Sequence, residues 1–184
     1  MIIVLRLRMI ETNKIIEKHL LRKAFLYEIK LEIDSDYFIN KIEEYLKETN
    51  LYYKTNVKGK MTAWQAFNND ENFRKVLDQA INHISKHIHF NKSELESCWG
   101  LKLEKGDYTA RHNHETSALS GVLYLNDVQQ ELIFPDLSIN VKPKKGTFII
   151  FTPWLDHMTE INQSDEAKYA IAFNFREFKD KTWS

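Results

Sequence analysis

Cysteine, net charge and long apolar runs are scarce in this chain, and each shortage excludes a class of protein. The single cysteine, Cys98, has no partner for an internal disulfide within the 184 residues, which fits a reducing compartment, and we expect the cytoplasm. The 26 basic and 26 acidic residues cancel, so no global field draws the chain to nucleic acid or to an anionic membrane. Arg6 and Arg8 interrupt the apolar opening "MIIVLRLRM" well before the roughly 20 residues that span a bilayer. We therefore expect neither nucleic acid nor a membrane as a partner.

The hydrophobic pattern predicts helices in the first half of the chain and strands in the second. No repeat, low-complexity tract or linker divides residues 1–184, so we expect a single domain with helix-rich support over 1–96 and a catalytic core over 97–178. Apolar residues recur at helical spacing over 34–50 and 68–88. The residues at 24–33 alternate as in a strand, and Asp70 is the candidate N-cap of the second helix.

From residue 97 the apolar period becomes two. Seven short segments alternate in this way and are bounded by turn residues: "CWGLKLE", "DYTARHNH", "SGVLYLN", "ELIFP", "SINVKP", "GTFIIF" and "KYAIAFNF". So many short strands within about 80 residues are typical of an antiparallel sandwich or barrel. We expect the two helices to pack on one outer face of it.

The segment "RHNH" places two histidines at positions i and i+2. On a strand such residues point the same way, so His112 and His114 are aimed at one place. His157 follows the strand "GTFIIF" and the turn "TPWLD", which makes it the best candidate for a third ligand. Imidazoles suit Fe, Zn, Cu or Ni, and three ligands with open positions are typical of a catalytic site. The alternative is that His112 and His114 are solvent-exposed strand residues and that His157 is an isolated loop histidine.

The segment "KYAIAFNF" has two different faces. One face is apolar, whereas the other carries Lys168, two alanines and Asn174. The alanines leave room, and a lysine is costly to bury without an anion. With the hydroxyl of Tyr124 from a neighbouring strand, Lys168 is suited to one end of a dicarboxylate whose other end chelates a metal. A solvent-facing strand with Lys168 in water is the alternative.

Between about Trp99 and Phe175 the sequence resembles the Fe(II)- and 2-oxoglutarate-dependent oxygenases, in particular the prolyl-4-hydroxylase-like branch and its small bacterial and phage members. The matching segments, in order, are "RHNH", "SGVLYLN", "ELIFPD", "KPKKGTFIIF", "PWLDH" and "AKYAIAFNF". The resemblance implies a double-stranded β-helix, or jelly-roll, core. It also implies Fe(II), 2-oxoglutarate and O₂ as cofactor and co-substrates. The implied activity is hydroxylation of a C–H bond, of a prolyl or other peptide residue or of a small molecule, with release of succinate and CO₂.

The resemblance also assigns roles to single residues. His112 and His157 match the first and the distal iron ligands. Lys168 and Tyr124 match the residues that bind the distal carboxylate of 2-oxoglutarate, and Asn174, on the face of Lys168, is a weaker candidate for contact with co-substrate or substrate. His114 occupies the position where the family has a carboxylate, so all three ligands would be histidines and the iron site one unit more positive.

Two other functions stay open on the sequence. One is a cupin-like dioxygenase that uses three histidines without 2-oxoglutarate, in which case Lys168 and Tyr124 have no role in the chemistry. The other is an inactive jelly-roll domain that binds a partner, with His114 as the mark of lost catalysis. Dependence of turnover on 2-oxoglutarate separates the 2-oxoglutarate-dependent oxygenase from the cupin-like dioxygenase. Loss of iron binding supports the inactive domain. Substrate and oligomeric state are not predicted.

Overall fold

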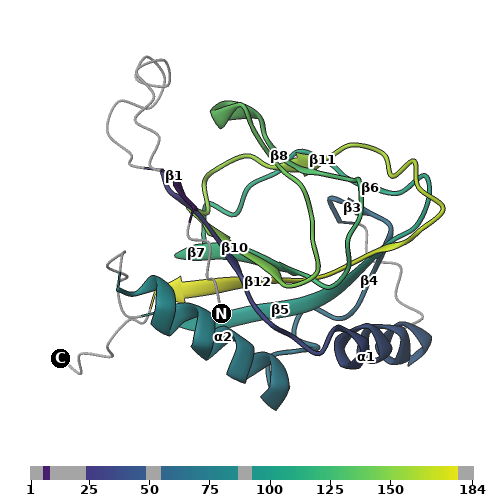
Figure 1. Ribbon diagram of the computed structural model, residues 1–184, viewed down its shortest axis with the longest axis horizontal. Coiled ribbons are helices and arrows are strands. Elements are labelled where there is room, and N and C mark those ends of the chain that lie inside the picture. The colour runs from purple at the N-terminus through teal and green to yellow at the C-terminus, as the bar shows by residue number, and fades with distance from the viewer. Residues whose placement is uncertain (1–5, 9–23, 49–54, 87–92, 178–184) are drawn as a thin grey trace.

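The computed structural model describes residues 6–8, 24–48, 55–86 and 93–177. Apart from Arg6 to Arg8, the apolar opening of the sequence lies outside the described residues, as does the predicted end of the second helix beyond Lys86. The described part of the chain forms two helices on one side of a large antiparallel sheet and shorter strands on its other side (Figure 1). None of the described helices is long and apolar enough to cross a membrane.

The large sheet has seven strands. Their spatial order is β1 (Arg6–Arg8), β2 (Leu26–Lys30), β10 (Thr147–Phe151), β7 (Leu119–Tyr124), β12 (Lys168–Glu177), β5 (Ser93–Leu103) and β4 (Lys60–Met61). Every neighbouring pair is antiparallel. Strand β12 has β7 and β5 on its two sides, so the strand predicted to carry Lys168 lies inside the sheet and not at its edge.

The shorter strands form two further groups opposite this sheet. One is β11 (Met158–Thr159), β8 (Leu132–Phe134) and β9 (Ile139–Val141), with the 3₁₀ turn η1 (Pro135–Leu137) between β8 and β9. The other is β3 (Val57–Lys58) with β6 (Tyr108–Thr109). Figure 1 shows these strands above the large sheet, on the side away from the helices. The space between the layers is where the inward side chains meet.

The helices begin where the sequence predicts. Helix α2 (Glu71–Ile84) is capped by Asp70, whose Oδ1 accepts the Phe73 N–H at 2.8 Å, as expected for an N-cap. Its other oxygen, Oδ2, accepts the hydroxyl of Tyr37 at 2.8 Å and so joins α2 to helix α1 (Ser35–Glu48). The apolar stripe of α2, Phe73, Leu77, Ala80 and Ile84, is buried against the outer face of the large sheet.

The inward face of the large sheet is set by strand register. Antiparallel partners share a face, so Ala172 of β12 lies level with Trp99 of β5 and Val122 of β7. One step along in each direction, Ala170 is level with Tyr124, and Asn174 is level with Ser120. These residues line a cavity between the two layers, and those contributed by β12 are small or polar.

One predicted strand is shorter than the sequence suggests. Alternation predicts a strand over 107–114, but β6 ends at Thr109, and beyond it only His112 forms a bridge, with His157. His114 lies in a loop, and its backbone N–H donates to the carbonyl of Pro153 at 2.8 Å. The two histidines thus converge through a bridge and a turn, and not through the pleat of a regular strand.

Candidate metal centre

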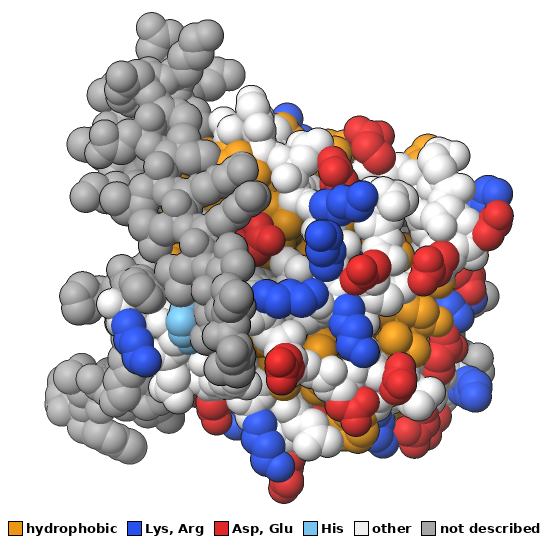
Figure 2. Space-filling model, viewed as in Figure 1, with side chains coloured by type: hydrophobic (Ala, Val, Ile, Leu, Met, Phe, Trp, Pro, Cys, Tyr) orange, Lys and Arg blue, Asp and Glu red, His pale blue; other side chains and the backbone are white. Residues whose placement is uncertain are grey.

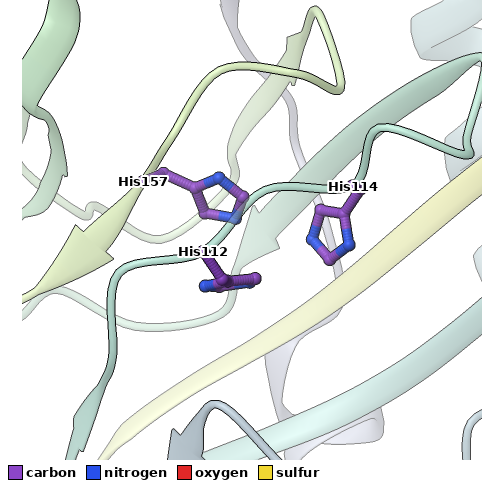
Figure 3. A group of neighbouring side chains, drawn as sticks. All are labelled: His112, His114 and His157. Carbon is purple, nitrogen blue, oxygen red and sulfur yellow. The ribbon is translucent and has the colours of Figure 1, made fainter.

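Three histidines from two segments face one another and line the cavity. His112 and His114 belong to the segment after β6, and His157 directly precedes β11 (Figure 3). One ligating nitrogen from each ring lies within 4.8 Å of those from the other two. The described residues contain no other group of three His, Cys, Asp or Glu side chains this close. The three predicted ligands are therefore brought together in space, although their role as metal ligands stays a prediction.

Backbone carbonyls fix the orientation of two of the rings. Nδ1 of His112 lies 2.8 Å from the Ala110 carbonyl oxygen, and Nδ1 of His157 lies 3.0 Å from that of Leu155. Because a carbonyl oxygen only accepts hydrogen bonds, each Nδ1 carries the proton and each Nε2 keeps its lone pair. Metal-binding histidines are commonly held in this way.

Burial keeps all three rings neutral. Desolvation is the main cause, and it lowers the pKa of His112 below its ordinary value. Desolvation, reinforced by the repulsion that a protonated His112 would exert, lowers the pKa of His114 to about 4 and that of His157 to about 3. Neutral imidazole is the form that binds a metal, so the site is ready for a cation at neutral pH.

Asp156 connects the two segments that carry the histidines. Its Oδ1 accepts the Asn113 side-chain amide at 2.8 Å, and its Oδ2 accepts Nε of Arg111 at 2.7 Å. Partial burial raises the pKa of Asp156, but the hydrogen bonds from Asn113 and Arg111 outweigh burial and hold this pKa below its ordinary value. Arg111 also contacts Asp136 at 3.0 Å. The sequence analysis missed this cluster, although Asp156 directly precedes His157 and Asn113 separates the other two histidines.

Behind the histidines the cavity is mainly apolar. The empty space at this site is about 600 Å³, the part open to solvent included. Val122, Phe151 and Ala172 are among the residues that line it. Such a lining excludes water from the space next to the histidines and strengthens any electrostatic contact made there.

Lys168 and Tyr124 are two of the polar residues that line this cavity. Lys168 is 3% exposed, and no carboxylate among the described residues forms an ion pair with it. Burial lowers the pKa of its ammonium group to about 7. Burial is also the main reason why the pKa of the Tyr124 phenol is raised. A buried lysine with no carboxylate partner among the described residues, in the same cavity as a phenol that keeps its proton, is suited to an anionic ligand.

Asn174, the remaining candidate of the sequence analysis, and two tryptophans lie in or next to the cavity. Asn174 lines the cavity six residues along β12 from Lys168 and accepts the Ser120 hydroxyl at 2.8 Å. Trp154 packs against the apolar cluster next to the cavity. Trp99, which the sequence analysis did not single out, lines the cavity with its ring 6.5 Å from that of His114.

The donor set fits an iron-group cation. Three neutral imidazoles on one side, with space on the other, match a catalytic site with open coordination positions. The buried Lys168 in the same cavity fits a carboxylate-bearing co-substrate. His112, His114 and His157 would hold the metal, and Lys168 with Tyr124 would hold the distal end of the co-substrate.

No protein-family model matches the sequence, and a search of curated proteins gives no match. Solved structures do match. A viral collagen prolyl hydroxylase from Paramecium bursaria Chlorella virus-1, in complex with 2-oxoglutarate, is 21% identical with a TM-score of 0.66, over 83% of this chain and 96% of that chain. A prolyl-4-hydroxylase from Pseudomonas putida is 15% identical with a TM-score of 0.63, over 90% and 97% of the two chains.

HygX from Streptomyces hygroscopicus, with nickel and 2-oxoglutarate bound, is 10% identical with a TM-score of 0.63, over 94% of this chain and 90% of that chain. Similarity to these oxygenases along most of the chain shows that this protein has their double-stranded β-helix fold. The fold predicted from the sequence is thereby confirmed. The shared fold does not by itself identify the reaction, because one fold supports many activities.

Proposed function

We propose that this protein is an Fe(II)- and 2-oxoglutarate-dependent dioxygenase that hydroxylates a C–H bond of its substrate. The observation that carries the proposal is the pairing, in one cavity, of a three-histidine cluster with a buried lysine that has no carboxylate partner among the described residues. A histidine cluster alone would fit several metals and reactions, and a buried lysine alone would fit many anions. In one cavity the two features match a metal and a dicarboxylate that chelates it.

The roles of the residues follow from their chemistry. His112, His114 and His157 hold the metal through neutral nitrogens, and the carbonyls of Ala110 and Leu155 keep two of the rings oriented. Lys168 forms an ion pair with the distal carboxylate of the co-substrate, and Tyr124 donates its hydroxyl proton to the same group.

When bound, Fe(II) and 2-oxoglutarate supply the oxidising chemistry, in which O₂ is consumed and succinate and CO₂ are released as the C–H bond is hydroxylated. This chain binds and orients the reactants and excludes water. The small side chains of Ala170 and Ala172 leave space between Lys168 and the histidines, and the apolar cavity wall limits the entry of water that would quench a reactive species.

The proposal is tested by anaerobic titration of the Fe(II)-loaded protein with 2-oxoglutarate, followed by the weak visible charge-transfer band of the chelate. We expect a saturable band in the wild-type protein and a band that is lost or much weaker at the same ligand concentration in Lys168→Ala. Binding of Fe(II) should be unchanged in that variant, because Lys168 is not a ligand.

Two results contradict the proposal, and they point to different functions. Iron binding without a band favours a three-histidine dioxygenase that does not use 2-oxoglutarate. No iron binding at all favours a jelly-roll domain that binds a partner without catalysis.

We also propose a cytoplasmic location and no nucleic-acid or membrane partner. Cys98, the only cysteine, is buried and free. On the face shown in Figure 2, basic and acidic side chains of the described residues are interspersed. The free cysteine supports a reducing compartment. The interspersed charges support a protein whose partner is its substrate, a peptide or small molecule, and not a highly charged surface.

A further inference from the structure

Two tryptophans connect the candidate metal centre to the protein surface. The centroid of the Trp99 ring lies 6.5 Å from that of His114, and the centroid of the Trp64 ring lies 4.7 Å from that of Trp99. Aromatic rings in contact have centroids about 4.5–7 Å apart. The exposed fraction rises along this path, from 5% at Trp99 to 42% at Trp64. The three rings therefore form a chain of contacts that leads from a candidate ligand to water.

The backbone holds the two tryptophans together. Trp64 lies between β4 and α2, and its carbonyl accepts the N–H of Cys98, the residue before Trp99 on β5, at 2.8 Å. Two residues earlier, the Thr62 N–H donates to the Gly100 carbonyl at 3.0 Å. The loop is thus fixed to β5 on both sides of Trp99, so the contact between the rings does not depend on side-chain packing alone.

Trp99 is the most easily oxidised of the described rings that contact the three histidines. Apart from the histidines themselves, the other rings are those of Phe134 and Phe151, 6.0 Å and 4.8 Å from that of His157. A phenyl ring gives up an electron far less readily than an indole. Tyr124 also lines the cavity, but no ring contact in the described part of the chain leads from it to the surface. An electron that the metal centre takes from this shell and that can be replaced from outside therefore comes from Trp99.

Burial decides where an oxidised tryptophan comes to rest. An indole that has lost an electron becomes acidic at its N–H, and it forms a neutral radical only where a base accepts that proton. Nε1 of Trp99 is buried and has no hydrogen-bond partner among the described residues. Trp99 therefore keeps its proton and stays a strong oxidant, whereas Trp64, which is exposed, can release a proton to water. The missing electron consequently moves from Trp99 to Trp64.

We propose that Trp99 and Trp64 form an electron relay that protects the metal centre when O₂ reacts in the absence of substrate. This inference rests on the proposed oxygenase function. O₂ accepts four electrons: two come from 2-oxoglutarate as it becomes succinate and CO₂, and in productive turnover two come from the C–H bond of the substrate. Exclusion of side reactions is one of the tasks of a protein that activates O₂.

Without substrate, Trp64 supplies one of the two missing electrons through Trp99, and the other is lost by the iron as Fe(II) becomes Fe(III). The N–H bond of Trp64 breaks, and a proton ends in hydroxide. Fe(II), O₂, 2-oxoglutarate and the Trp64 indole thus give Fe(III), succinate, CO₂, hydroxide and a neutral Trp64 radical. One atom of O₂ is in succinate and the other in hydroxide. A soluble thiol returns a hydrogen atom to Trp64, and a one-electron donor such as ascorbate returns the iron to Fe(II).

The relay is tested by exposing the Fe(II)-loaded protein to O₂ and 2-oxoglutarate without substrate or reductant, and by locating added oxygen with peptide mass spectrometry. Because no reductant restores it, the Trp64 radical combines with further O₂. We expect the wild-type protein to carry added oxygen on Trp64 and not on Trp99. Protein loaded with Zn(II) should carry none on either residue.

Trp64→Phe and Trp64→Tyr are the decisive pair, because they differ by one hydroxyl group. A phenyl ring blocks the relay, so Trp64→Phe should move the added oxygen to Trp99. An exposed phenol also releases an electron and a proton, so Trp64→Tyr should leave Trp99 unmodified. Trp99→Phe should lose the oxidation of Trp64, although Trp64 stays exposed. Trp154→Phe is the control, since Trp154 packs against the apolar cluster next to the cavity, and it should be oxidised at Trp64 as the wild type is.

Two results overturn the inference. One is the absence of added oxygen on Trp64 in the wild type. The other is equal oxidation of Trp64 in Trp99→Phe and wild type, which would assign the reaction to radicals in solution.

Hydrogen peroxide separates this inference from the proposed function, because it oxidises the Fe(II) protein without 2-oxoglutarate. Peroxide accepts one electron from Fe(II) and one electron with the N–H proton from Trp64, and it is converted to hydroxide and water. Oxidation of Trp64 by peroxide that requires Trp99, in a protein that gives no visible band with 2-oxoglutarate, supports the relay and contradicts the oxygenase proposal. A visible band without oxidation of Trp64 supports the oxygenase and overturns the relay.

Discussion

His112 and His157 are joined by a pair of backbone hydrogen bonds. The His112 N–H donates to the His157 carbonyl at 3.1 Å, and the His157 N–H donates to the His112 carbonyl at 2.8 Å. Two segments that are 45 residues apart in sequence therefore meet at the two residues whose rings face the cavity. The ring centroids lie 4.2 Å apart, so the backbone itself brings these two candidate ligands together.

Asp156 is the side chain that reinforces this bridge, and its removal should weaken metal binding. Asp156→Ala loses the hydrogen bonds from Arg111 and Asn113 and so frees the loop between His112 and His114. Outer-shell residues typically contribute about 10–100-fold to metal affinity, and we expect a loss of that size for Co(II), read from its visible spectrum. Asp136→Asn is the control, because the only ion pair of Asp136 among the described residues is with Arg111, and this variant should change the affinity less than about threefold. Equal Co(II) affinity in Asp156→Ala and wild type would contradict a positioning role.

Binding of 2-oxoglutarate should weaken as the pH rises above neutrality. In the free protein, burial holds the pKa of Lys168 near 7, whereas an ion pair with a carboxylate favours the charged form and raises this pKa. Binding above pH 7 therefore requires uptake of a proton, and the apparent Kd should rise by up to about tenfold per pH unit. The measurement is the anaerobic Fe(II) titration repeated at several pH values between 6 and 9.

Lys168→Arg serves as the matched control for this pH dependence. A guanidinium group stays protonated throughout this range, so the variant should bind with an affinity that changes little with pH. An equally steep loss of affinity in Lys168→Arg would assign the pH dependence to another group.

Replacing His114 by aspartate should weaken co-substrate binding without abolishing iron binding. His114→Asp adds a negative charge to the ligand set, and a unit charge about 4 Å away changes an interaction by about 1–4 kcal/mol, depending on the dielectric. We therefore expect the Kd for the anionic 2-oxoglutarate to rise at least about fivefold, with Fe(II) still bound. His114→Ala, which removes the ligand without adding charge, should instead lower Fe(II) affinity. Unchanged 2-oxoglutarate affinity in His114→Asp would place His114 outside the ligand set.

The sequence predicted the features that depend on local pattern. Asp70 as a helix cap and the two faces of β12 follow from the chemistry of one residue and from alternation, and both are present in the structure. The order of the matching segments also predicted the fold, which the solved structures confirm. Local pattern failed at His114, because alternation was extended past Thr109, where regular pairing ends.

What the sequence could not give are contacts between distant segments. Asp156 reaches Arg111 across 45 residues, and Asn174 is oriented by Ser120 across 54. Each contact depends on strand register, which a single sequence specifies only after the pairing partners are known. Trp99 was overlooked for the same reason, since its place beside the cavity is set by its pairing with Ala172.

Gly121 is a position where the outer face of the large sheet has no room for a side chain, and an added methyl group should destabilise the fold. A Cβ there would lie 2.4 Å from Cζ of Phe173 and 2.6 Å from the Ile149 carbonyl oxygen, and the second of these is backbone that cannot rotate away. Overpacking of this kind costs about 1–3 kcal/mol, so Gly121→Ala should lower the free energy of unfolding by at least that amount in urea titration. Adding Phe173→Leu relieves only the first clash, and a double-mutant cycle should give a coupling of at least about 0.5 kcal/mol. Additive effects would mean that the Phe173 ring is not what excludes a side chain at Gly121.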